Sequence, residues 1–145
     1  MKILVSACLL GLCCRYDGQS KPRQEILDLL QEHELIPVCP EQLGGLPTPR
    51  APSERCGSRV LAKTGGDVTE QYTRGAQQVL RLARLYGCQC AILKERSPSC
   101  GTGEIYDGTF TGTLAKGDGV TTALLRSNGI AVFGESRVQE LPKDF

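Results

Sequence analysis

Histidine is nearly absent from this sequence, which narrows the chemistry that the chain can perform. His33 is the only histidine among 145 residues, and no two cysteines form a Cys-x-x-Cys pair. Structural zinc sites are usually built from such ligands, so the sequence argues against one. A Ser-His-Asp triad would depend on His33, which falls on a predicted amphipathic helix away from the serines, so this mechanism is also disfavoured.

Long apolar runs and an excess of charge of one sign are also missing. The formal net charge is +1, so the chain lacks the excess of positive charge that is typical of proteins that bind a nucleic acid or an anionic membrane. The apolar runs are too short to cross a bilayer, and the run at residues 1–8 is too short for a secretion signal. We therefore expect a cytoplasmic protein whose partner is neither a membrane nor a nucleic acid.

Cysteine, by contrast, is plentiful, with eight residues in the chain. Thiols are kept reduced in the cytosol, so metal ligands or reactive thiols are expected before disulfides. The hydrophobic content of 40% and the charged content of 23% are ordinary for a globular protein. We expect one domain, residues 1–145, with its own hydrophobic core.

Short apolar segments alternate with helical patterns along the chain. The apolar segments predict buried strands at residues 2–7, 35–38, 90–93 and 130–133. The helical patterns lie at residues 22–32, 68–86 and 120–127. This order predicts βαβ units in a Rossmann-like α/β fold, with a mainly parallel sheet and helices on both faces (a three-layer α/β/α domain).

The segments between these elements carry further local signals. They predict a long loop at 42–58, a short edge strand at 59–62, a hairpin with a type I′ turn at 105–110 and a short tail at 136–145. Asp118 is expected to cap the last helix, and Gly75 to mark close packing of its helix on the sheet.

Three cysteines directly follow predicted strands: Cys8, Cys39 and Cys100. The segments that follow parallel strands gather at the carboxyl edge of the sheet, where ligands bind. Three thiolates at this edge suit a soft metal centre, and a [4Fe-4S] cluster held by three cysteines would leave one iron open. The alternative is that these are only buried thiols.

The other cysteines divide by position. Cys88 and Cys90 lie at the start of the third strand, at the opposite end, and are interpreted as buried core residues. Cys13, Cys14 and Cys56 fall in longer loops on the functional side, and we assign no role to them.

Two further features lie at the same predicted edge. The loop Ser97-Pro98-Ser99-Cys100-Gly101 carries two hydroxyls and a thiol directly after a buried strand. It is either a functional loop or a simple Pro/Gly turn. Glu41, two residues beyond Cys39, is either a general acid or base or an ordinary surface glutamate.

Four motifs together resemble a known family: Ser6–Gly11, Pro37–Glu41, Gly44–Arg50 and Lys94–Gly101. The sequence is similar to the thiouracil desulfidase family, small bacterial iron–sulfur proteins long grouped as a domain of unknown function. The similarity continues at residues 67–69, 74–76, 106–108, 119–123 and 128–130, so the resemblance covers nearly the whole chain.

The resemblance implies a [4Fe-4S] cluster bound by Cys8, Cys39 and Cys100. Its open iron would take the sulfur of a thiolated pyrimidine, 2-thiouracil or similar, as hydrosulfide and leave the oxo form without net redox change. Glu41 matches the family's acidic residue, expected to activate water, and Ser99 matches its catalytic serine. Ser97 is expected to help hold the polar edge of the substrate ring.

Two alternatives to this function stay open. One is an iron–sulfur or sulfur carrier without catalysis of its own, and the other is an enzyme acting on thiolated nucleosides or tRNA. Either a monomer or a homodimer is compatible with the sequence.

Overall fold

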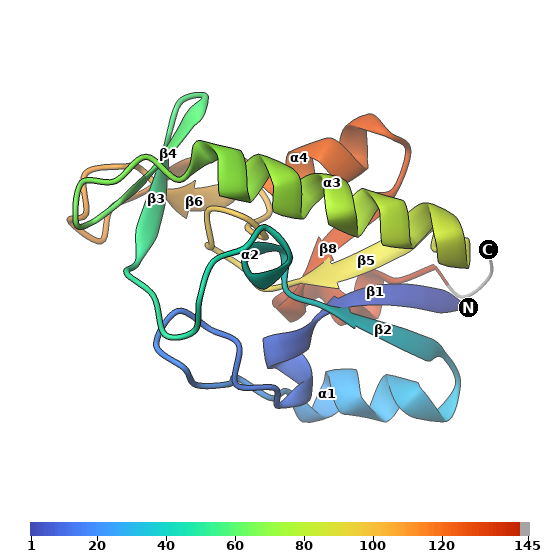
Figure 1. Ribbon diagram of the computed structural model, residues 1–145. Coiled ribbons are helices and arrows are strands. Elements are labelled where there is room, and N and C mark those ends of the chain that lie inside the picture. The colour runs from blue at the N-terminus through green and yellow to red at the C-terminus, as the bar shows by residue number, and fades with distance from the viewer. Residues whose placement is uncertain (143–145) are drawn as a thin grey trace.

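The computed structural model of the protein describes residues 1–142. Its centre is a four-stranded parallel sheet in the order β2-β1-β5-β8 (Figure 1). The strands are β1 (Lys2–Ser6), β2 (Glu34–Val38), β5 (Cys90–Leu93) and β8 (Ala131–Gly134). All four predicted strands are confirmed to within one residue at each end, because short apolar runs buried on both faces leave little choice of structure.

Helices cover both faces of this sheet, as expected (Figure 1). Helices α3 (Thr69–Tyr86) and α4 (Val120–Ser127) lie on one face, and α1 (Gln24–Leu27) with the 3₁₀ turn η2 (Asp28–Gln31) lies on the other. The three-layer α/β/α fold is therefore confirmed, although the helix predicted at 22–32 is divided into these two short pieces. No helix within residues 1–142 combines the length and the apolar character needed to span a membrane.

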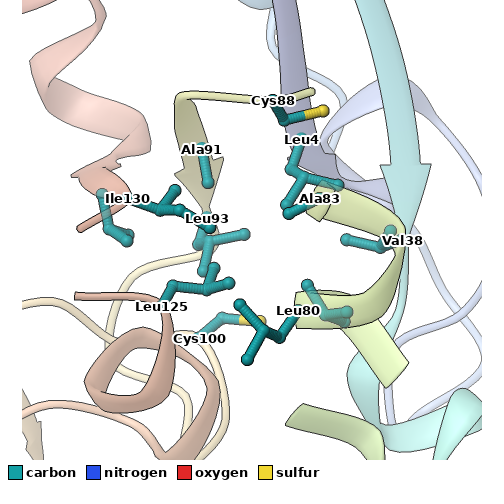
Figure 2. Packing of buried hydrophobic residues seen from close by; sticks show 12 residues of the cluster. Leu4, Val38, Leu80, Ala83, Cys88, Ala91, Leu93, Cys100, Leu125 and Ile130 are labelled. Carbon is teal, nitrogen blue, oxygen red and sulfur yellow. The ribbon is translucent and has the colours of Figure 1, made fainter. Parts of the chain in front are cut away.

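Alternating side chains of the sheet build one core on each face. Leu4 packs with residues of α3 and α4, such as Leu80 and Leu125 (Figure 2). Its neighbours Ile3 and Val5 point the other way, into the core beneath α1. Burial on both faces removes apolar area from water on each side of the sheet, and this is the main stabilising term for a domain of this size.

The remaining elements surround the carboxyl edge of the sheet. They are η1 (Ala7–Leu10), α2 (Pro40–Leu43), β3 (Ser53–Cys56), β4 (Arg59–Ala62), β6 (Glu104–Tyr106), β7 (Leu114–Lys116) and η3 (Glu135–Glu140). The long loop predicted at 42–58 is therefore wrong in part, since it includes the end of α2 and all of β3. Strand β4 pairs with β3 in a separate hairpin and is not an edge of the central sheet.

The tail predicted at 136–145 contains most of η3, and residues 143–145 lie outside the described residues.

The tight hairpin predicted at 105–110 is wrong, because β6 pairs antiparallel with β7, the next strand along the chain, across a longer loop at residues 107–113. The Asp-Gly signal is overridden by side-chain contacts. The Asp107 carboxylate accepts hydrogen bonds from the backbone N–H and the hydroxyl of Thr109. The backbone N–H of Phe110 donates to Glu54 on β3. The loop is thereby anchored to β3.

The capping role expected of Asp118 is also wrong. Gly119 is the N-cap of α4 and makes no side-chain cap. The Asp118 carboxylate instead accepts hydrogen bonds from the backbone N–H of Gly103 and from Arg126. The charged Arg126, in the last turn of α4, competes successfully with the backbone N–H groups at the start of the helix.

Helices α2 and α3 touch at the level of their backbones. A Cβ atom added to Gly75 of α3 would lie 1.9 Å from the carbonyl oxygen of Pro40. One added to Gly44, at the end of α2, would lie 1.9 Å from the carbonyl oxygen of Gln71. Gly75 therefore marks close packing on α2, not on the sheet as expected.

Replacing Gly75 by alanine tests this contact. Alanine favours a helix by about 1 kcal/mol over glycine, but its methyl group would push α2 away from α3. We expect the Gly75→Ala substitution to lower the free energy of unfolding by about 1–3 kcal/mol, the usual cost of overpacking. Urea denaturation measures this, with Gln78→Ala, an exposed position on the same helix, as the control. A Gly75→Ala protein as stable as the wild type would contradict the prediction.

Candidate functional site

A cavity of about 500 Å³ opens at the carboxyl edge of the central sheet. Its walls come from the segments that follow β1, β2 and β5, which are neighbours in the sheet. Cys8 lies in η1 directly after β1, Cys39 directly follows β2, and Cys100 lies in the loop after β5. The structure brings all three thiols to this one cavity.

A fourth cysteine, Cys14, also lines the cavity and is buried. Its thiol lies close enough to the thiols of Cys8 and Cys39 for both to affect its pKa. The Cys39 thiol also lies 3.6 Å from the Cys14 carbonyl oxygen, to which it donates. The sequence carried only a weak signal for this residue, the adjacent Cys13-Cys14 pair, of which Cys13 is exposed.

The other cysteines do not reach the cavity. Cys88 and Cys90 are buried at the amino end of β5, on opposite faces of the sheet. Cys56 lies on β3, and its thiol donates to the carbonyl oxygen of Gly108 over 3.6 Å. The division between edge cysteines and core cysteines that was expected from topology is therefore visible in the structure.

The thiols of Cys14, Cys39 and Cys100 are kept protonated at neutral pH by burial. Burial raises the pKa of the Cys100 thiol to about 12. The neighbouring Cys39 thiol lowers the pKa of Cys14, but the Cys8 thiol and burial outweigh this effect and raise the Cys14 pKa to about 11. The pKa of Cys39 is raised by its hydrogen bond to Cys14 and by burial. Metal binding at these thiols would therefore release protons.

The thiols surround the cavity without converging on one point. Among residues 1–142, no three Cys, His, Asp or Glu side chains are grouped so that they could hold a metal ion. A single zinc ion needs such convergence. The thiolates of an iron–sulfur cluster bind different iron atoms, so soft sulfur donors spread around one cavity fit a cluster and do not fit a lone zinc ion.

Glu41 lies in the first turn of α2 and lines the cavity. Pro40 opens this helix, a position where its fixed φ suits the first turn. Oε1 of Glu41 accepts hydrogen bonds from Nε of Arg50 at 3.0 Å and from the hydroxyl of Tyr72 at 2.8 Å. The Glu41 side chain is only 15% exposed, and two hydrogen bonds fix the position of its carboxylate, so Glu41 is not an ordinary surface glutamate.

The two predicted serines lie in different surroundings. Ser97 lines the cavity, and its Oγ accepts hydrogen bonds from the backbone N–H groups of Ser99 and Cys100 at 3.1 and 2.7 Å. Ser99 is fully buried and does not line the cavity. Its hydroxyl lies 2.9 Å from that of Thr121 on α4. The structure therefore brings Ser97, but not Ser99, to the thiols and Glu41.

Sequence reasoning did not identify Arg50 and Tyr72 as site residues. Arg50 belongs to one of the family motifs, and Tyr72 falls within the helix predicted at 68–86, but neither pattern indicates a role in the site. Burial, followed by the charge of Glu41, raises the pKa of Tyr72, so its hydroxyl remains a donor. No local pattern could have paired either residue with Glu41, because the contacts join separate elements.

Aromatic and cationic residues both line the cavity. Tyr16, Tyr106 and Phe110 contribute rings to its lining. The cationic residues that line it, apart from Arg50, are Arg15, Lys21, Lys63, Lys94 and Arg96. A concave site with apolar walls and a few polar groups is typical of small-molecule binding.

Comparisons with known proteins show which family the chain is similar to. Residues 3–137 match the model of the 2-thiouracil desulfurase family. The uncharacterised protein YbbK of Bacillus subtilis (strain 168) is 42% identical over 149 positions, which cover 96% of this chain and 99% of that protein. A solved structure, described as the [4Fe-4S]-dependent thiouracil desulfidase TudS, has a TM-score of 0.92 and 51% identity over 97% of this chain and 94% of its own.

These matches define the class first: the protein is an enzyme that cleaves carbon–sulfur bonds. More narrowly, the chain belongs to the 2-thiouracil desulfurase family, and the resemblance noted in its sequence is confirmed.

Proposed function

We propose that this chain removes the sulfur of a thiolated pyrimidine, 2-thiouracil or a close analogue, using a [4Fe-4S] cluster held by Cys8, Cys39 and Cys100. One observation carries the proposal: these three cysteines follow three neighbouring strands and line one cavity. Glu41 lines the same cavity, and two hydrogen bonds fix its carboxylate there. The 51% identical structure, described as depending on the same cofactor, supports the proposal.

The overall reaction exchanges sulfur for oxygen. Water supplies the oxygen, hydrosulfide leaves, and no electrons are gained or lost. When bound, the cluster would supply a soft Lewis-acidic iron, which suits a thiocarbonyl sulfur and polarises the carbon attached to it. Attack of water on that carbon then needs a group that takes up a proton.

The residues of the chain supply the proton transfer and the orientation. Glu41 would accept the proton of the attacking water, since its carboxylate lines the cavity and is fixed by two donors. The Ser97 oxygen already accepts two backbone hydrogen bonds, so its own O–H remains available to hold the polar edge of the ring. Ser99 lies outside the cavity, and we assign to it the anchoring of this loop on α4.

Serine substitutions separate cluster ligands from core cysteines. Wild-type protein prepared without oxygen should contain about four irons per chain. Cys8→Ser, Cys39→Ser and Cys100→Ser should each lose most of this iron, because oxygen is a poorer match for it than sulfur. Iron and sulfide analysis measures the outcome. The controls Cys88→Ser and Cys90→Ser should retain their iron, and equal losses in Cys88→Ser and Cys39→Ser would refute the assignment.

The substitution Glu41→Gln tests the proton acceptor. The amide keeps the size of the side chain but cannot take up a proton, so turnover should fall by about 10²–10⁴-fold, the usual contribution of general acid–base catalysis. Iron content should not change. Sulfide release and iron per chain are measured on one anaerobic preparation, with Glu70→Gln on the exposed face of α3 as the control. Full activity in an iron-replete Glu41→Gln protein would remove Glu41 from the mechanism.

The same assay tests the carrier alternative. A catalyst releases many sulfides per chain from purified protein and substrate alone. A carrier would release at most one per chain until a partner protein is added.

A thiolated nucleoside, free or within tRNA, is the second candidate substrate. The cationic side chains that line the cavity favour its tRNA form, because they would attract the phosphate groups that tRNA carries and a free nucleoside lacks. Of these, Lys21, Lys63 and Arg96 form no salt bridge within residues 1–142.

Salt dependence distinguishes the two substrates. We expect kcat/KM for 2-thiouracil to change little between low and high salt, since the free base carries no phosphate. Binding of thiolated tRNA would weaken steeply with salt as counterions are released. Sulfide release from thiouracil, thiouridine and thiolated tRNA is compared at two salt concentrations. Turnover of tRNA alone, with no release from the free base, would favour the second candidate.

A further inference from the structure

We propose that Arg50 and Tyr72 are positioning residues for the reaction, which hold Glu41 by one oxygen so that only the other oxygen handles the proton. The inference rests on the proposed role of Glu41 as proton acceptor. It extends that role by assigning the proton to Oε2 and by naming the two side chains that make this choice.

Tyr72 supplies the first contact from α3. Its side chain is 1% exposed, and its hydroxyl donates to Oε1 of Glu41 at 2.8 Å. The close backbone packing of α2 on α3 keeps this distance short, because Gly44 and Gly75 leave no side chain between the helices. A hydrogen bond to a charged acceptor in a buried site is stronger than one between neutral groups.

Arg50 supplies the second contact from the loop after α2. Nε donates to Oε1 of Glu41 at 3.0 Å. Nη1 donates to Oγ1 of Thr48 and to the Pro47 carbonyl oxygen, and Nη2 donates to the Cys14 carbonyl oxygen at 2.9 Å. Every nitrogen of this guanidinium group, which is only 6% exposed, is therefore engaged within the protein. Arg50 cannot turn towards a substrate without breaking these contacts.

The two donors share one oxygen, and this leaves the carboxylate asymmetric. Within residues 1–142, Oε2 of Glu41 accepts no hydrogen bond, while Oε1 accepts two. Rotation of the carboxylate would break both contacts at once. Oε2 is thus the oxygen that can accept a hydrogen bond from a water molecule in the cavity.

A purely structural role for the two residues would also explain their burial, so the experiment must separate the two possibilities. A double-mutant cycle does so. If Tyr72 acts through Glu41, its hydroxyl matters only while Glu41 can accept a proton. If Tyr72 only stabilises the fold, its loss has the same effect whatever residue stands at position 41.

The cycle compares the wild type, Tyr72→Phe, Glu41→Gln and the double variant, with kcat, KM and iron per chain measured for each. We expect Tyr72→Phe to lower kcat by about 10-fold, as for the loss of one hydrogen bond to a charged group, with KM and iron unchanged. In the Glu41→Gln background the same change should have no further effect on the residual rate. The control Tyr86→Phe, half exposed on the same helix, should match the wild type.

Arg50→Lys provides a second test that does not depend on Tyr72. Lysine keeps the charge, but its single ammonium group cannot reach both Glu41 and the Cys14 carbonyl oxygen in the geometry of the guanidinium fork. We expect a reduced kcat with KM retained, and again no further loss in the Glu41→Gln background. Arg74→Lys, an exposed position on α3, is its control.

The possible outcomes separate this inference from the proposed function. Full kcat in both Tyr72→Phe and Arg50→Lys, with Glu41→Gln impaired, would overturn the positioning role and leave the role of Glu41 intact. Losses that multiply in the double variants would also overturn it, since the residues would then act independently of Glu41. Full activity of Glu41→Gln would instead refute the proposed role of Glu41 itself.

Discussion

Parallel pairing of β1 with both β2 and β5 is the constraint on which the site depends. In this register Ser6 lies opposite Val38, and the backbone N–H of Lys94 donates to the Ser6 hydroxyl at 2.9 Å. The three strands therefore end at the same level, and the residues that follow them meet at one edge. Thiols that are more than 30 residues apart in the sequence can reach a common cavity only because of this alignment.

The carboxylate reaches the cavity by a different route from the thiols. Helix α2 has only four residues and would not be stable in isolation. It is held by its backbone contact with α3 and by the hydrogen bonds that Glu41 makes to Arg50 and Tyr72. The packing that stabilises α2 therefore also sets the position of Glu41, the residue that we propose as the proton acceptor.

Local sequence signals succeeded where no tertiary partner competed with them. Strand β5 and helix α4 have the predicted bounds, because burial and helical periodicity depend on neighbouring residues. The signals at Asp107 and Asp118 failed for different reasons. Asp107 accepts hydrogen bonds from Thr109, two residues further along the same loop, whereas Asp118 accepts them from Gly103 and Arg126 and so does not cap α4. Short polar side chains bind whichever donors the fold brings near them, so their local preferences are weak evidence.

The sequence by itself determined the layered fold, the family and the placement of Cys8, Cys39 and Cys100 after successive strands. These follow from the order of apolar segments and from motifs whose residues are close together in the chain. Only the tertiary structure decided that Ser97 and not Ser99 lines the cavity, and that Cys14 lies beside Cys8 and Cys39. It also decided that one oxygen of Glu41 is held by donors from two other segments. The direction of a loop side chain depends on packing between distant segments, which no periodicity in the sequence records.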